Sequence, residues 1–163
     1  MKVMIFLGSD SDFEVIEDAL KILKEFKVPC RLEVTSAHRS PERTVGLIKQ
    51  AETDGAEVFI AVAGKAAHLA GVVAAHTVRP VIGVPVESDA LAGQDALFST
   101  VQMPKGIPVA TMALGQHGGS NAALLAVEIL ALKDDDLRKK LVDYRAKMAA
   151  GVETSSKKIQ ERL

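Results

Sequence analysis

Short apolar runs alternate with amphipathic stretches along this chain, and that alternation predicts a parallel sheet whose strands are joined by crossover helices. The run Val3–Leu7 contains no polar position, which is typical of a strand covered on both faces. The stretch that follows, from about Ser11 to Phe26, has apolar residues at helical spacing. Further strands are predicted at Leu32–Thr35, Val58–Val62, Val81–Val84 and Pro108–Ala113. Further helices are predicted at Pro41–Thr53, Ala66–Thr77, Gln94–Val101, Asn121–Leu132 and Asp134–Ala149.

The order of these elements predicts the fold class. Five strands with intervening helices give an α/β three-layer sandwich with a parallel, flavodoxin-like sheet and a C-terminal helix. The 163 residues suit a single domain, residues 1–163, because no linker or repeat interrupts the pattern. The polar tail after Gly151 is expected to fray or to extend as an exposed helix.

Charge and hydropathy argue against two kinds of partner. Lys and Arg number 20 against 21 Asp and Glu, and without a basic cluster this balance argues against nucleic acid. His68, His76 and Arg79 interrupt the longest apolar candidate, so we expect no membrane-spanning segment. The single Cys30 cannot form an internal disulfide, and Met1 leads into a strand-like segment rather than a signal peptide. We therefore expect a cytoplasmic protein.

Small side chains replace aromatic ones in this chain. Aromatic residues make up only 4% of it, whereas Ala and Gly are dense in Ala61–Ala75 and Val109–Ala131. The helix expected at Asn121–Leu132 is apolar on nearly every side except at Glu128, which is typical of a buried helix. Small side chains let backbones approach closely, which suits packing within the chain or between subunits.

Polar segments, three of which contain glycine, follow four of the predicted strands. Because ligands bind beyond the carboxyl ends of the strands in such sheets, these segments predict a single site at one edge. They are Gly8–Asp12, Ser36–Arg39, Ala63–His68 and Gly115–Asn121.

The first segment is suited to an anion or to a diol. Ser9 and the amides around Gly8 can donate hydrogen bonds to an anion at a helix N-terminus. Asp12 would repel phosphate there and is better suited to accept hydrogen bonds from hydroxyls such as a ribose diol. The alternative is that the acids only cap the helix, and Ser11 and Glu14 have the spacing of a capping box.

The second and third segments supply candidate catalytic groups. Arg39 beside Ser36 presents a planar, permanently charged fork that suits phosphate. His38 lies between these two residues and is suited to acid/base work near neutral pH. His68 opens a helix among small residues. From these residues alone, a solvated arginine and two packing histidines remain the alternatives.

Other chemistries lack their residue patterns. His76 lies eight residues from His68, about 12 Å along a helix, and with one Cys we expect no metal site. Gly118–Asn121 is only a loose phosphate-like loop, and neither it nor Gly8–Ser11 has the spacing of a Walker or dinucleotide loop. Few aromatic residues are available to hold a flavin. A phosphoacceptor domain needs an Asp at the end of the third strand, where residues 62–64 are Val-Ala-Gly.

Six blocks of sequence, in a fixed order, carry a resemblance to a known family. They are Gly-Ser-Asp-Ser-Asp (8–12), Ser-Ala-His-Arg-Ser-Pro (36–41), Ala-Ala-His-Leu (66–69), Pro-Val-Ile-Gly-Val-Pro-Val (80–86), Val-Gln-Met-Pro-Lys-Gly-Ile-Pro-Val-Ala-Thr (101–111) and Asn-Ala-Ala-Leu-Leu-Ala (121–126). From Val3 to about Gly151 the chain closely resembles the PurE family of 5-(carboxyamino)imidazole ribonucleotide mutases.

The resemblance implies a cofactor-free enzyme of de novo purine biosynthesis. Such an enzyme moves a carboxylate from the exocyclic nitrogen to ring carbon C4 of an aminoimidazole ribonucleotide. In the family's mechanism the carbamate loses carbon dioxide, which stays trapped until the ring carbon attacks it, and a histidine transfers the C4 proton. The family assembles as homo-octamers, and we therefore predict that the helix Asn121–Leu132 and the segment Ala66–Ala75 pack closely at subunit contacts.

Ten positions of this chain acquire roles from the resemblance. His38 matches the acid/base histidine, His68 matches a second active-site histidine, and Arg39 matches the phosphate contact. The other substrate-binding positions that the resemblance implies are Ser9, Asp12, Ser36, Gly64, Lys65, Ala66 and Leu69.

The third segment departs from the family pattern at two positions. Lys65 and Ala70 stand where the family commonly has Gly and Pro, and Lys65 adds a cation beside the expected carboxylate. A related branch carboxylates the ribonucleotide directly with free carbon dioxide, but it replaces the Ala-Ala-His segment, so His68 favours the mutase. The alternative from another class is a non-catalytic nucleotide-binding module, against which the intact pair His38 and His68 argues.

Overall fold

The computed structural model describes residues 1–88 and 90–162, and within them five parallel strands form one sheet. The strand order is β2-β1-β3-β4-β5, which confirms the predicted flavodoxin-like α/β fold. The strands are β1 (Val3–Leu7), β2 (Cys30–Val34), β3 (Val58–Gly64), β4 (Val81–Val86) and β5 (Ala110–Thr111).

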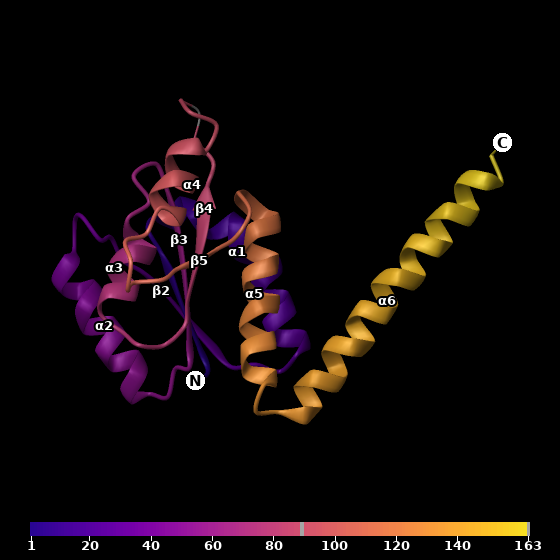
Figure 1. Ribbon diagram of the computed structural model, residues 1–163, viewed down its shortest axis with the longest axis horizontal. Helices are drawn as coiled ribbons and strands as arrows, with labels where there is room; N and C mark the ends of the chain where they lie inside the picture. Colours follow the sequence, from indigo (N-terminus) through magenta and orange to yellow (C-terminus); the bar gives the residue numbers. More distant parts are fainter. Residues whose placement is uncertain (89, 163) are drawn as a thin grey trace. The chain divides into compact units, whose positions relative to one another are not determined.

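Helices cover both faces of the sheet (Figure 1). The short turn η1 (Asp10–Asp12) leads into α1 (Phe13–Glu25), which lies with α5 (Gly115–Ala131) on one face. The opposite face carries α2 (Pro41–Thr53), α3 (Leu69–Ala75) and α4 (Gln94–Val101). The chain divides into two compact units, Met1–Val127 and Glu128–Leu163, and all five strands belong to the first. The second contains α6 (Asp135–Gln160).

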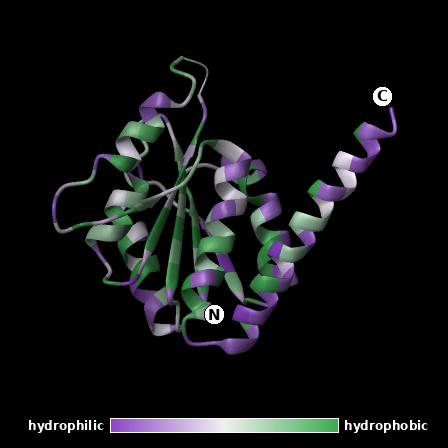
Figure 2. Ribbon diagram, turned by 45° about the vertical axis from the view of Figure 1, so that its right-hand side comes forward, coloured by the Kyte–Doolittle hydropathy of each residue, from purple (hydrophilic) through white to green (hydrophobic). Residues whose placement is uncertain are grey.

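Alternate residues of the central strand β1 pack on opposite faces of the sheet. Met4 and Phe6 are at most 1% exposed and belong to one cluster with Ile48 of α2 and Val73 of α3. The rings of Phe6 and Phe59 stack with their centroids 6.0 Å apart. Because strand side chains alternate, the intervening residues of β1 point to the other face, where α1 lies. The central strands β1, β3 and β4 are therefore apolar along their length, as Figure 2 shows, whereas the edge strand β2 includes Arg31 and Glu33.

The chain ends in a longer helix than the sequence pattern predicts. Asp134 caps α6 by accepting hydrogen bonds from the amides of Asp136 and Leu137, and the helix then continues to Gln160 instead of ending near Ala149. The predicted polar tail is thus an exposed helix, and its last residue, Leu163, lies outside the described residues. In the part of the chain that the structure describes, no helix combines the length and the apolar character needed to cross a membrane.

Two glycines that the sequence analysis places in a phosphate-like loop lie inside α5, so that interpretation is wrong. Helix α5 begins at Gly115, six residues before the predicted start at Asn121. A Cβ on Gly118 would overlap the carbonyl oxygen of Ala113, and one on Gly119 would overlap that of Val15 in α1. These glycines let backbone segments approach each other closely.

Small side chains of the two segments predicted at subunit contacts are buried within this chain. In α3, Ala70 and Val73 are at most 3% exposed, and in α5, Ala122, Ala123 and Ala126 are fully buried. Close packing thus occurs inside the subunit, and contacts between subunits stay a prediction. The edge strand β5 pairs only Ala110 and Thr111 with β4, fewer residues than predicted. An edge strand needs few pairs, and Pro108 has no amide to donate.

Candidate functional site

A cavity of about 770 Å³ opens at the carboxyl ends of the strands, within the first compact unit. Four segments line it, one after each of β1, β2, β3 and β4. The lining residues are Gly8, Ser9, Ser11, Asp12, Ser36, Ala37, His38, Arg39, Ala63, Gly64, Lys65, Ala66, Leu69, Val86, Glu87 and Ser88. Nine of the ten predicted site residues are in this set, and the tenth, His68, contacts one of them.

The segment after β1 is held by a capping box, two residues earlier than predicted. The amide of Ser9 donates to Oδ2 of Asp12 at 3.0 Å, and the amide of Ser11 donates to Oγ of Ser9 at 3.3 Å. The predicted pair Ser11 and Glu14 is therefore not the box, because the chain first makes the short turn η1. Asp12 is only 7% exposed, and its burial raises the pKa of the carboxyl above the ordinary value of 3.8.

The segment after β2 brings a permanent positive charge to the cavity. The amide of Arg39 donates to Oγ of Ser36 at 3.1 Å, which closes a tight turn around His38. The guanidinium of Arg39 reaches across to the carbonyl oxygen of Gly8, with Nη2 at 3.4 Å. Arg39 therefore links the first two segments, and its remaining donors are available to an anion in the cavity.

The two candidate histidines contact each other. Nε2 of His38 lies 2.9 Å from Nδ1 of His68, and the rings meet edge to face with their centroids 5.0 Å apart. A hydrogen bond between two ring nitrogens needs one donor and one acceptor, so at least one of the two imidazoles is neutral. His68 precedes α3 and makes no side-chain cap to it. A neutral imidazole beside a second titratable ring can accept and return a proton.

The segment after β3 places Lys65 at the cavity in an unusual conformation. Lys65 has φ of 55°, in the left-handed region that favours glycine. Among the described residues, its ammonium group has no hydrogen-bond or ion-pair partner. Gly64 beside it packs against β4, where an added Cβ would lie 3.4 Å from the carbonyl oxygen of Val86. The small residues here leave room at the cavity wall.

The fourth lining segment differs from the predicted one. Residues 115–121 are helical and do not line the cavity, so their assignment to the site is wrong. The end of β4 takes their place with Val86, Glu87 and Ser88. Strand β4 pairs with β3 in the sheet and Gly64 lies opposite Val86, which brings these residues to the site. The sequence does contain a signal for this segment, because the polar pair Glu87 and Ser88 directly follows the apolar run Val81–Val86.

The fold and the site together define a class of protein. Open α/β sheets of this flavodoxin-like class bind ligands beyond the carboxyl ends of their strands, which is where Arg39, Asp12 and His38 line the cavity. The family model described as AIR carboxylase matches residues 2–151. The chain belongs to this family.

Two similar proteins share a name, and a solved structure shares the fold. A protein of Methanocaldococcus jannaschii named N5-carboxyaminoimidazole ribonucleotide mutase is 52% identical over 98% of this chain and 98% of its own length. The Escherichia coli protein of the same name is 50% identical over 88% of this chain and 85% of its own. Among solved structures, Treponema denticola PurE superposes with a TM-score of 0.86 at 32% identity and covers 96% of each chain.

Proposed function

We infer that this chain is an N5-carboxyaminoimidazole ribonucleotide mutase of purine biosynthesis. Relatives of that name match at about half of all positions over nearly the full chain. The contact of His38, which lines the cavity, with His68 is the observation that carries the chemistry. The substrate is a small ribonucleotide whose carboxylate moves from the exocyclic nitrogen to ring carbon C4.

The proposed reaction balances without an external proton. The carbamate C–N bond breaks, carbon dioxide leaves, and the nitrogen takes up one proton from the histidine pair, which the later loss of the C4 proton restores. Ring carbon C4 then forms a C–C bond to carbon dioxide and loses its own proton. His38 accepts that proton, and its 2.9 Å contact with His68 gives the imidazole pair a second site that can share it. The electron-rich ring attacks without a metal provided that carbon dioxide is retained beside it.

The remaining predicted residues have proposed binding roles. Arg39 and Ser36 hold the phosphate, because the guanidinium is permanently charged and the turn amides are close by. Ser9 and Asp12 bind the ribose, since an ionised Asp12 has free acceptor capacity beyond its bond to the Ser9 amide.

The proposed carboxylate pocket is formed by the segment after β3. Gly64, Ala66 and Leu69 supply its small or apolar wall, and Lys65 supplies a cation for the migrating carboxylate. The cation attracts a carboxylate but not neutral carbon dioxide, so it also stabilises the bound carbamate substrate relative to the carbon dioxide that forms from it.

A direct carboxylase that uses free carbon dioxide is the alternative function. The test supplies purified protein with the carbamate ribonucleotide in a buffer without added bicarbonate and follows the C4-carboxylated product. A mutase forms product at once under these conditions. Product that appears only from the aminoimidazole ribonucleotide with high bicarbonate identifies the carboxylase, and tight nucleotide binding without any product identifies a binding module.

We further propose that the protein is a cytoplasmic homo-octamer. Helix α6 carries exposed apolar side chains, among which Met148, Val152 and Ile159 are 57%, 71% and 57% exposed. At 100° per residue these three fall within an arc of about 40°, so they form one apolar stripe that suits burial against another subunit. Sedimentation at micromolar concentration tests the proposal, and a monomer contradicts it.

A further inference from the structure

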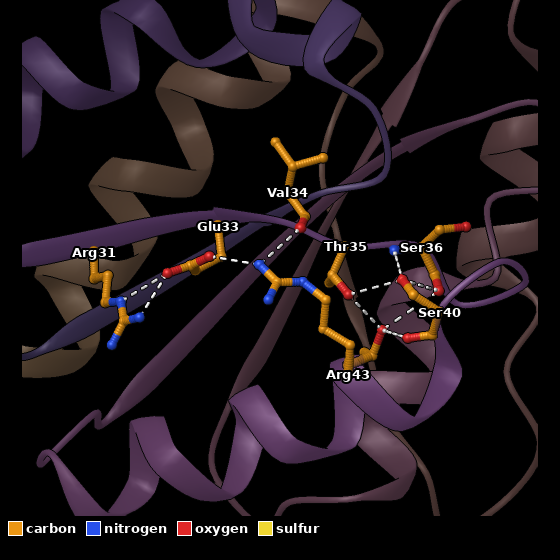
Figure 3. A network of polar contacts seen from close by, with 8 residues as sticks. Arg31, Glu33, Val34, Thr35, Ser36, Ser40 and Arg43 are labelled. Carbon is orange, nitrogen blue, oxygen red and sulfur yellow. Dashed lines mark hydrogen bonds and ion pairs between the residues drawn. The ribbon is translucent and has the colours of Figure 1, made fainter.

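A series of hydrogen-bonded hydroxyl groups joins the end of β2 to the start of α2, across the loop that carries His38 and Arg39. Figure 3 shows Thr35, Ser36 and Ser40 of this series. Thr35 follows β2 and is 2% exposed, whereas Thr44 lies in the first turn of α2 and is 0% exposed. Their Oγ1 atoms are 2.8 Å apart. Buried hydroxyl groups are costly unless they are paired, so this pair joins the strand end to the helix at a fixed distance.

Each hydroxyl group has one proton to donate, so the hydrogen bonds along this series of hydroxyl groups run in one direction. Thr44 Oγ1 donates to the carbonyl oxygen of Ser40 at 3.2 Å, so it accepts at 2.8 Å from Thr35. Ser40 Oγ donates to the carbonyl oxygen of Ser36 at 3.2 Å and accepts from the Ser36 amide at 3.0 Å. The hydroxyl groups of Thr35, Thr44 and Ser40 thus each have an acceptor to which they donate.

These hydrogen bonds fix both ends of the loop, residues 36–40, that carries His38 and Arg39. Ser40 occupies the N-cap position of α2, as predicted, but makes no side-chain cap to the helix. Its hydroxyl points back to Ser36 instead, and Ser36 Oγ in turn accepts from the amide of Arg39. His38 therefore lies in a turn whose two ends, Ser36 and Ser40, are hydrogen-bonded to each other. Thr44 in turn bonds to the carbonyl oxygen of Ser40.

The second tether between β2 and α2 is an exposed ion pair. Arg43 Nη2 lies 2.8 Å from Oε2 of Glu33, which also pairs with Arg31 (Figure 3). Exposed pairs of this kind restrain geometry weakly, because water and salt compete for the charges. The buried hydroxyl chain is the stiffer of the two connections.

We propose that Thr35 and Thr44 are positioning residues that set the place of His38 against His68. They touch neither the substrate nor the reacting atoms in this account, and neither lines the cavity. Their effect on turnover rests on the mutase function proposed above. The effect on the histidine ring does not.

The experiment compares variants of Thr44 that keep either its shape or its hydroxyl group. Thr44→Val keeps the shape and loses the hydroxyl, and Thr44→Ser does the reverse. Thr44→Val is expected to lower kcat about tenfold, since a small displacement of a catalytic group has large effects on rate. Thr35→Val is expected to lower kcat less, about threefold, because Thr44 keeps its bond to Ser40. Thr44→Ser is expected to recover most of the turnover.

Thr100→Val is the matched control. Thr100 is 2% exposed and its hydroxyl bonds to the carbonyl oxygen of Ala96 within α4, away from the loop. The same substitution at Thr100 therefore removes an equally buried hydroxyl without removing a hydrogen bond of the loop 36–40. The kcat of Thr100→Val is expected to remain that of the parent. Equal losses of kcat in Thr44→Val and Thr44→Ser, or a parental kcat in Thr44→Val, overturn the proposal.

A second measurement separates this inference from the proposed function. The chain has 4 histidines, so the ring signals can be followed by NMR, with that of His38 assigned through His38→Asn. Thr44→Val is expected to shift the His38 signal, and Thr44→Ser and Thr100→Val to leave it in place. An unmoved His38 signal in Thr44→Val overturns the positioning role even if the parent protein has no mutase activity.

Discussion

Two lysines of this chain adopt the left-handed backbone conformation, and only one of them lines the cavity. φ is 55° at Lys65 and 58° at Lys27, which follows the end of α1. This conformation costs a residue with a Cβ atom about 1 kcal/mol relative to glycine. Lys65→Gly and Lys27→Gly are therefore each expected to raise the free energy of unfolding by about 1 kcal/mol, which for a chain of this size raises Tm by about 2–4 °C.

The same two substitutions are expected to differ in catalysis. The exposed ammonium of Lys65 lines the cavity, and an exposed ion pair contributes up to about 1 kcal/mol, or about fivefold in an equilibrium constant. Lys65→Gly should thus lower kcat/KM for the carbamate ribonucleotide by up to about fivefold while it stabilises the fold. Lys27→Gly should stabilise the fold and leave kcat/KM unchanged.

A third variant separates the charge of Lys65 from its backbone strain. Lys65→Met removes the ammonium group and keeps a Cβ atom at φ of 55°, so it should lower kcat/KM without stabilising the protein. Urea unfolding and steady-state kinetics on the three variants are the assays. Parental kcat/KM in both Lys65 variants would refute the proposed contact with the carboxylate, and unchanged stability in both glycine variants would refute the strain argument.

Two further predictions concern packing and pH. Gly119→Ala should destabilise the protein by about 3 kcal/mol, since its Cβ would overlap the carbonyl oxygen of Val15. A Cβ on Gly46 in α2 meets nothing within 4 Å, so Gly46→Ala should stabilise the protein by about 0.5–1 kcal/mol. Similar urea midpoints for the two variants would contradict this. Burial raises the pKa of Asp12, so the stability that this carboxyl contributes is present below its ordinary value of 3.8 and is lost as pH rises through the raised pKa. Asp12→Asn should therefore gain stability relative to the parent between about pH 4 and pH 7 and bind nucleotide more weakly, and a stability difference that stays constant with pH would count against this interpretation.

The fold could be predicted from the sequence because each central strand is a continuous apolar run. Strands β1 and β3 are buried on both faces, so their patterns have no competing interpretation. The errors fall where tertiary contacts override local preference. Residues 115–120 contain three glycines and read as a loop, yet they are helical because Gly118 and Gly119 allow backbone approaches that larger residues would block.

Three of the four segments that line the cavity were predicted, but the fourth and the geometry of the site were not. Polar segments after parallel strands must meet at one edge, so the gathering of His38, Arg39 and Asp12 follows from topology. The 2.9 Å contact between His38 and His68 depends on how two loops fold, and no spacing in the sequence encodes it. Lysine itself gives no sign of the positive φ at residue 65, and the one signal is that the family commonly has glycine there.

The most direct test of the central claim is the activity and nucleotide affinity of His38→Asn. His117→Asn is the control, because His117 lies in α5 and does not line the cavity. Each protein is supplied with the carbamate ribonucleotide without added bicarbonate, and product formation and nucleotide binding are measured side by side. We predict that His38→Asn binds the nucleotide and forms no C4-carboxylated product, while His117→Asn behaves as the parent. Sustained product formation by His38→Asn would contradict the assignment of proton transfer to this histidine.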